Sequence, residues 1–272
     1  MNGKKVLAIQ DISCVGQCSI TAVLPVLSHF GMETAILPTA ILSNHTMYKK
    51  WSYFDFAPEF ENVFDAWKVN DIKFNGYVLG YLGSKKYMEL SEKIFREFSE
   101  EGAKIIIDPV FGDNGKLYPG FDENYVQSVR EFISLADVIV PNITEACFLA
   151  GLPFPERCDK AYVEKLVEKL KGLTEGTIII TGVEEDGKIG EAIASPEDGG
   201  AIEYVFDEKL PRFFHGTGDI FTATYAAHWL NGLSHAESCR AAGKFVADCI
   251  RATGDNHPYG VQFEDVMKAS LR

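Results

Sequence analysis

Hydrophobic positions along the chain follow two alternating patterns. Short aliphatic and β-branched runs predict strands, and longer segments with apolar residues every three to four positions predict helices. The predicted strands cover residues 4–10, 33–42, 76–83, 103–109, 137–141 and 176–181. The predicted helices cover residues 19–31, 59–70, 85–102, 123–135, 144–151 and 160–172, and we expect the third to end at Gly102.

This alternation predicts an α/β fold. Parallel strands need crossover connections, so strand–helix alternation indicates a central, mostly parallel sheet with helices on both faces. The strands at 104–108 and 137–140 carry apolar residues on both faces, which is typical of central strands. Residues 183–212 break the pattern and predict an antiparallel hairpin around the turn at 196–200, and two helices follow within 218–253. Since no repeat or linker divides the sequence, we expect one domain over residues 1–272.

Composition narrows the class of protein and its partners. The chain has 272 residues, 46% of them hydrophobic, and a formal net charge of −13. The negative charge argues against a nucleic-acid partner, because binding to that polymer needs clustered Lys and Arg. No apolar run approaches the roughly 18 residues of a membrane span, and the first residues do not resemble a secretory signal. We therefore expect a cytoplasmic protein without a membrane partner.

Candidate site residues follow the predicted strands. Ligands of open parallel sheets bind outside the carboxyl ends of the strands, so side chains at these ends are expected to converge. The residues concerned are Gln10, Asp11, residues 80–84, Asp108, Pro141, Asn142, Thr181 and Gly182.

The segment GTGD at residues 216–219 is the strongest sign of chemistry. Its glycines permit close approach of a ligand, and the free N–H groups at the start of the following apolar helix favour an anion. The alternative is a structural turn in which Asp219 only caps the helix. Burying a charged helix start costs free energy unless a ligand uses it, and this favours function.

Other acids have two interpretations each. Asp108 and Asp113 offer oxygen ligands that suit Mg²⁺, but they also fit an acid before a Pro turn and an Asx turn. Asn142 and Glu145 have the spacing of a capping box, which remains compatible with a place beside a ligand.

Several motifs resemble those of known kinases. GTGDIF at 216–221 resembles the signature of ribokinase-like kinases. LSNHTMYKKW at 42–51, GYLGS at 80–84, IDPVFGDNGKLY at 107–118 and VIVPNITEACFLAG at 138–151 resemble the pyridoxal kinase branch in order and spacing. The resemblance extends over about residues 4–253 and implies a ribokinase-like three-layer α/β/α fold. The implied activity is ATP-dependent phosphorylation of the 5′-hydroxymethyl group of a vitamin B6 compound.

The resemblance also implies residue roles. Asp219 is the expected base, beside an anion hole formed by Gly216, Thr217 and Gly218. The expected ATP-binding residues are Asn142, Glu145, Thr181, Thr217 and Gly218, and the expected metal residues are Asp108, Asp113 and Glu145. The expected substrate residues are Asp11, His45, Thr46, Tyr81, Asp219 and the flap residue Tyr118. Mg²⁺, a monovalent cation such as K⁺, and a homodimer contact in the segment 38–56 are further implications.

Asp11 departs from the family pattern, in which serine is usual. A carboxylate against the pyridine ring favours a cationic substituent, so we hypothesise a preference for pyridoxamine over pyridoxal. For His45 and Tyr81, a purely structural place in the core stays open. At the level of function, hydroxymethylpyrimidine kinase and a non-catalytic vitamin-binding protein are the alternatives. A sugar kinase is less favoured, since no long lid insertion follows the first strand–helix unit.

Overall fold

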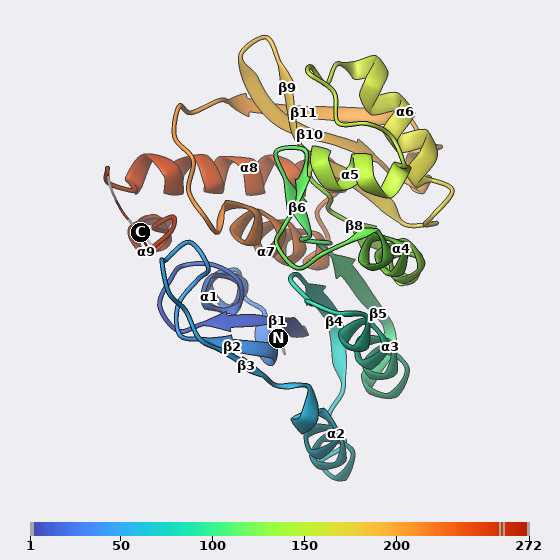
Figure 1. Ribbon diagram of the computed structural model, residues 1–272, viewed down its shortest axis with the longest axis vertical. Coiled ribbons are helices and arrows are strands. Elements are labelled where there is room, and N and C mark those ends of the chain that lie inside the picture. Colours follow the sequence, from blue (N-terminus) through green and yellow to red (C-terminus); the bar gives the residue numbers. More distant parts are fainter. Residues whose placement is uncertain (1–2, 256, 258, 271–272) are drawn as a thin grey trace.

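The computed structural model describes residues 3–255, 257 and 259–270, and a twisted sheet runs through it (Figure 1). Its strands are β1 Lys5–Ser13, β2 Glu33–Leu42, β3 Tyr53–Asp55, β4 Phe74–Leu79, β5 Ser99–Ile107, β8 Val138–Ile139, β9 Thr177–Glu185, β10 Lys188–Ala194 and β11 Ile202–Glu208. Their order is β11-β10-β9-β8-β5-β4-β1-β2-β3. Strands β1, β2, β4, β5, β8 and β9 pair in parallel, and β3, β10 and β11 pair antiparallel. The mostly parallel α/β fold is therefore confirmed.

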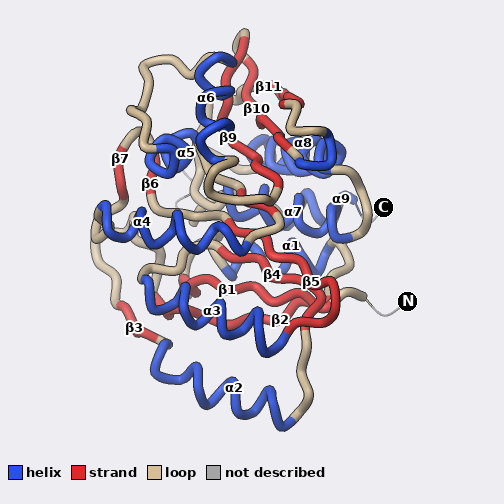
Figure 2. The backbone as a smooth tube through the Cα atoms, turned by 90° about the vertical axis from the view of Figure 1, so that its right-hand side faces the viewer, coloured by secondary structure: helices blue, strands red, loops and turns tan. Residues whose placement is uncertain are grey.

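Helices cover both faces of the sheet. They are α1 Ile20–His29, α2 Phe60–Val69, α3 Lys85–Phe98, α4 Glu123–Phe132, α5 Ile143–Ala150, α6 Lys160–Leu170, α7 Thr217–Leu230, α8 His235–Ala252 and α9 Glu264–Ser270. Helices α1, α7, α8 and α9 lie on one side in Figure 1, and α2 to α6 lie on the other. Two hydrophobic clusters, one on each face, match these two groups of helices. Figure 2 shows α3 and α4 crossing the front of the sheet.

Central strands are apolar on both faces, as their sequence predicts. Ile106 and Val138 pack into the cluster under α1, α7 and α8, whereas their chain neighbours Ile107 and Ile139 pack into the opposite cluster. Successive side chains of a strand point to opposite faces, so a strand between two helix layers needs apolar residues at every position.

The predicted end of the third helix is wrong. The helix expected to end at Gly102 ends at Phe98, and β5 begins directly at Ser99. The reason is tertiary: Ser99 pairs with Phe74 of β4, and its hydroxyl lies 2.9 Å from that of Tyr77. Local periodicity does not report such a contact.

Towards the end of the chain, most of the predicted elements are present. The antiparallel hairpin is confirmed as β10 and β11, joined by the short 3₁₀ turn Pro196–Asp198. The two helices expected within 218–253 are α7 and α8. Edge strand β3, the small ladder of β6 Gly112–Asp113 with β7 Lys116–Leu117, and α9 were not predicted. None of the described helices is long and apolar enough to cross a membrane.

Candidate active site

The start of α7 has no side-chain cap among the described residues, unlike the starts of α4, α5, α6 and α8. Its N-cap, Gly216, has φ 85°, and a Cβ there would collide with the backbone of Gln17. Only glycine fits this conformation and this close approach. The first N–H groups of the helix therefore remain available for an anion.

Gly218 has a different reason to be glycine. A Cβ at this position would meet only open space, so no neighbouring atom of the chain excludes a side chain. The open space lies beside the first turn of α7, where the helix dipole is positive. The turn can thus receive a phosphoryl group close to the backbone.

Asp219 lies in the first turn of α7 and is partly buried. Its Oδ2 accepts a hydrogen bond of 2.8 Å from the backbone N–H of Ser19, at the start of α1. Burial raises the pKa of Asp219 to about 7, and the nearby carboxylates of Asp108 and Asp11 add to this, while the Ser19 bond opposes it. A carboxylate with this pKa is half ionised near neutral pH and can accept a proton.

Two further acids lie close to each other beside α7. Asp108, after β5, accepts a 2.9 Å hydrogen bond from the Thr222 hydroxyl, and burial followed by the charge of Glu145 raises its pKa to about 8. Burial likewise raises the pKa of Glu145 to about 7. Neutralising either acid by a proton or by a cation is therefore favourable.

Glu145 is held rigidly at the start of α5. Its Oε2 accepts from the N–H of Asn142, and its Oε1 accepts from the N–H of Phe111, both at 2.9 Å. The Asn142 side chain accepts from the N–H of Glu145 in return, which confirms the capping box.

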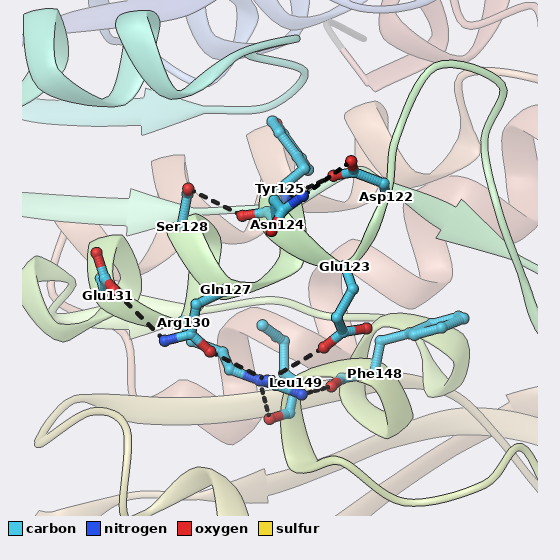
Figure 3. A network of polar contacts seen from close by, with 10 residues as sticks. All are labelled: Asp122, Glu123, Asn124, Tyr125, Gln127, Ser128, Arg130, Glu131, Phe148 and Leu149. Carbon is cyan, nitrogen blue, oxygen red and sulfur yellow. Dashed lines mark hydrogen bonds and ion pairs between the residues drawn. The ribbon is translucent and has the colours of Figure 1, made fainter.

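The other end of α5 is fastened to α4. Figure 3 shows Arg130 of α4 reaching the last carbonyls of α5, with bonds from its guanidinium to the oxygens of Phe148 and Leu149. Arg130 also pairs with Glu123 at 3.3 Å. A cation at a helix C-terminus satisfies free carbonyls and complements the dipole, so this contact fixes the helix that carries Glu145.

Of the residues expected at the nucleotide and the metal, Asn142 and Thr181 contact each other. Asn142 donates to the carbonyl of Gly112 at 2.9 Å and forms an isolated parallel bridge with Thr181. Thr181 lies within β9, where the pairing with β8 has ended, and not at the end of its strand as predicted. Asp113 accepts from both nitrogens of Asn114, whereas the N–H of Gly115 donates to the Thr144 hydroxyl, so the Asx turn expected at Asp113 does not form.

Asp11 is buried at the end of β1, with an exposed fraction of 6%. Its oxygens accept hydrogen bonds from the hydroxyls of Ser19, at 2.7 Å, and Ser13, at 3.4 Å. Burial raises its pKa. Tyr81 lies near enough that the Asp11 charge, after burial, raises the pKa of its phenol. Asp11, Tyr81 and Asp219 thus share one end of the sheet.

The other expected substrate residues differ in their surroundings. His45 is buried, and its ring lies 5.7 Å from that of His215, the residue before the anion-hole turn. Both histidines line one hollow, together with Met47, Tyr48, Phe213, Phe214, His257 and Gly260. Thr46 is exposed. Tyr118 lies near the acids: burial first, and then the charges of Glu145, Asp113, Asp108 and Asp219, raise the pKa of its phenol.

Sequence reasoning missed three residues of this region: Ser19, Thr222 and His215. Thr222 is one turn beyond Asp219 on α7, so helical spacing would have placed it on the same face. His215 directly precedes the glycine turn. Ser19 begins the first predicted helix beside the end of the first strand, but its two carboxylate contacts depend on the tertiary structure.

The acidic side chains of the site offer oxygen ligands for Mg²⁺. Among the described residues, no three His, Cys, Asp or Glu side chains form a cluster that could hold a metal ion alone. Mg²⁺ typically binds one or two carboxylates together with water and phosphate oxygens. The acid pair Asp108 and Glu145, whose ionisation burial opposes, fits that mode.

The fold and the site define a class. A mostly parallel α/β/α sheet whose carboxyl edge holds an uncapped helix start, a carboxylate in its first turn and a pair of acids is the arrangement of a ribokinase-like phosphotransferase.

A family profile described as phosphomethylpyrimidine kinase matches residues 14–263. The chain belongs to this family. A Schizosaccharomyces pombe protein with the provisional name pyridoxal kinase is 32% identical, over 83% of this chain and 74% of its own length.

Two solved structures are similar along almost the whole chain. One is a Bacteroides thetaiotaomicron protein provisionally described as a phosphomethylpyrimidine kinase, with 32% identity, a TM-score of 0.94 and coverage of 100% of this chain and 95% of that one. The other is the pyridoxal kinase of Lactobacillus plantarum, with 30% identity, a TM-score of 0.91 and coverage of 98% and 96%. The resemblance to vitamin B6 kinases is thereby confirmed.

Proposed function

We propose that this protein is an ATP-dependent kinase that phosphorylates the 5′-hydroxymethyl group of a vitamin B6 compound. The single observation that carries the proposal is Asp219, a partly buried carboxylate with a raised pKa at the uncapped start of α7. The similar Bacteroides thetaiotaomicron protein has also been crystallised with pyridoxal. That structure has a TM-score of 0.91 to this chain and 32% sequence identity.

The chain's own groups suit phosphoryl transfer. The oxygen of the 5′-hydroxyl attacks the γ-phosphorus of ATP, Asp219 takes the hydroxyl proton, and ADP leaves. The N–H groups of Gly216, Thr217 and Gly218 hold the charge that develops on the transferred group. Such fixed donors require little rearrangement during the reaction, because the helix already orients them.

The acids beside α7 have a separate task. Asp108 and Glu145 would hold Mg²⁺, with Glu145 acting through water because both of its oxygens already accept backbone hydrogen bonds. Asp113 is the third proposed metal residue. When bound, Mg²⁺ neutralises phosphate charge. Asn142 and Thr181, joined by their backbone bridge, would lie beside the nucleotide phosphates.

For the vitamin, we propose a pocket between the end of β1 and the GYLGS turn. Asp11 and Tyr81 would border the pyridine ring, and Tyr118 would cover it. His45 and Thr46 would close the vitamin pocket on the side that faces the hollow lined by His45 and His215. A planar ring suits an aromatic wall with few polar contacts.

The test is a coupled ADP-release assay with pyridoxal, pyridoxamine, pyridoxine and hydroxymethylpyrimidine. We expect turnover with at least one B6 compound and a product of the mass of its 5′-phosphate. The family description favours hydroxymethylpyrimidine kinase as the second candidate, and turnover of hydroxymethylpyrimidine alone would establish it instead. Binding of a B6 compound without any turnover would identify a non-catalytic vitamin-binding protein.

Further parts of the proposal rest mainly on the resemblance. They are one kinase domain over residues 1–272, a cytoplasmic location, a monovalent cation such as K⁺, and a homodimer that uses residues 38–56. Edge strand β3 supports the dimer, because its Tyr53 and Phe54 are exposed, as is the preceding Trp51. Sedimentation of the purified protein tests it, and a monomer at micromolar concentration would contradict it.

A further inference from the structure

Ser19 has a backbone conformation that serine rarely adopts. Its φ is 50° and its ψ is −138°, outside the regions that residues with a Cβ normally occupy. Such a conformation is strained and persists only where the surrounding structure imposes it. Strained residues of this kind cluster at functional sites, so the contacts of Ser19 are informative.

Both hydrogen-bond donors of Ser19 are directed at carboxylates. Its N–H donates to Oδ2 of Asp219 on α7, at 2.8 Å, and its hydroxyl donates to Oδ1 of Asp11 on β1, at 2.7 Å. Ser19 occupies the N-cap position of α1, yet its side chain does not cap that helix. The usual capping bond has been replaced by a bridge between two acids from different parts of the chain.

The loop that carries Ser19 is fixed on its other side as well. The N–H of Gln17 donates to the carbonyl of Tyr259 at 2.5 Å, and the carbonyl of Gln17 packs directly against Gly216. The loop and the anion-hole turn are thus in backbone contact. Movement of Ser19 would displace the donor to Asp219 relative to the amide groups of that turn.

We infer that Ser19 is a positioning residue for Asp219, and that Asp11 holds Ser19 in the required conformation. The Ser19 N–H occupies one oxygen of the Asp219 carboxylate and leaves the other to receive the proton of the acceptor hydroxyl. Fixing a reacting group in this way contributes to rate, because small misplacements are costly. This inference rests on the proposed function and assigns Asp11 a role beyond contact with the vitamin.

The two roles of Asp11 predict different kinetics. A residue that only contacts the vitamin changes KM or the preference among B6 compounds. A residue that fixes the base through Ser19 lowers kcat, and its effect depends on the Ser19 hydroxyl. A double-mutant cycle between Asp11 and Ser19 separates these cases.

The experiment compares Asp11→Ala, Ser19→Gly, their double variant and Asp11→Asn, with the best B6 substrate of the wild type. Glycine adopts the Ser19 conformation without strain and keeps the N–H, so Ser19→Gly is expected to fold. We expect Asp11→Ala and Ser19→Gly each to lower kcat about tenfold, and the double variant to lose no more than the larger single loss. Asp11→Asn should retain clearly more kcat than Asp11→Ala, because the amide oxygen can still accept from Ser19.

Ser13→Ala is the matched control, since it removes the longer of the two serine bonds to Asp11 and leaves Ser19 untouched. Its kcat should stay within about twofold of the wild type. Wild-type kcat in Ser19→Gly, additive losses in the double variant, or a change in KM alone would overturn the inference. A wild type that turns over no B6 compound would instead refute the proposed function, so the two failures are distinguishable.

Discussion

Buried polar groups at the two ends of the central sheet differ in their partners. At the amino end of β9, Thr177, Tyr225 and His235 form a closed network: the His235 ring lies 2.6 Å from the Tyr225 hydroxyl and 3.1 Å from that of Thr177. Burial lowers the pKa of His235 and so favours the neutral ring. At the carboxyl end, Asp108, Glu145 and Asp219 lie near one another, and burial is the first cause of the raised pKa of each.

The network at the amino end stabilises the fold, whereas the acids at the carboxyl end are suited to binding a ligand. A closed network of neutral partners satisfies its own donors and acceptors. Enclosed acids beside other acids disfavour their own ionisation, and an incoming cation relieves that cost. Stability is thus given up at the functional edge of the sheet, as is common at active sites.

The largest expected effect is on the carboxyl end. Asp219→Ala should lower kcat at least about a hundredfold, because it removes the proposed base. The measurement is coupled ADP release with a B6 compound, and the matched control is Asp265→Ala in the exposed first turn of α9. Near-normal turnover of Asp219→Ala would remove this residue from the role.

Disturbing the amino end should change stability and not activity. Tyr225→Phe leaves the buried His235 nitrogen without its closest partner and should lower the free energy of unfolding by about 1–3 kcal/mol. Urea unfolding measures this change, and kcat should stay within about twofold. Tyr204→Phe is the control, because the buried Tyr204 hydroxyl has no hydrogen-bond partner among the described residues. Equal losses in both variants would contradict the comparison.

The acids of the carboxyl end should make stability depend on pH. The pKa of Asp108 is raised from 3.8 to about 8, so the folded protein retains this proton while the unfolded chain releases it. Its contribution to stability is therefore present below pH 4 and is lost as the pH rises through 8.

Asp108→Asn removes this pH-dependent contribution. In metal-free urea unfolding, the variant should gain up to about 2 kcal/mol over the wild type at pH 9, relative to their difference at pH 4. A gain that is equal at both pH values would show that Asp108 ionises normally.

The smallest expected effect is on the choice between pyridoxamine and pyridoxal. Asp11→Ser should lower the ratio of kcat/KM for pyridoxamine to that for pyridoxal by about fivefold, the scale of one partly screened charge contact. The ratio is measured in the same ADP-release assay. An unchanged ratio would discard the charge preference while leaving the positioning role of Asp11 to its own test.

Some features of the site follow from short stretches of sequence and others do not. The capping box of Asn142 and Glu145 is local, since the cap and the residue three positions later contact each other in any helix that begins there. The contact between Arg130 and the end of α5 joins two helices, and no spacing predicts it. The same holds for the early end of α3, which depends on pairing between Ser99 and Phe74.

The sequence by itself determined the strand and helix alternation, the parallel sheet and the glycine turn before Asp219, because each depends on local periodicity or on backbone freedom. Only the tertiary structure decided that Ser19 bridges Asp11 and Asp219, and that Asp108 and Glu145 lie together. Those contacts join residues far apart in the chain, and burial by surrounding elements sets their protonation, so no single stretch of sequence contains them.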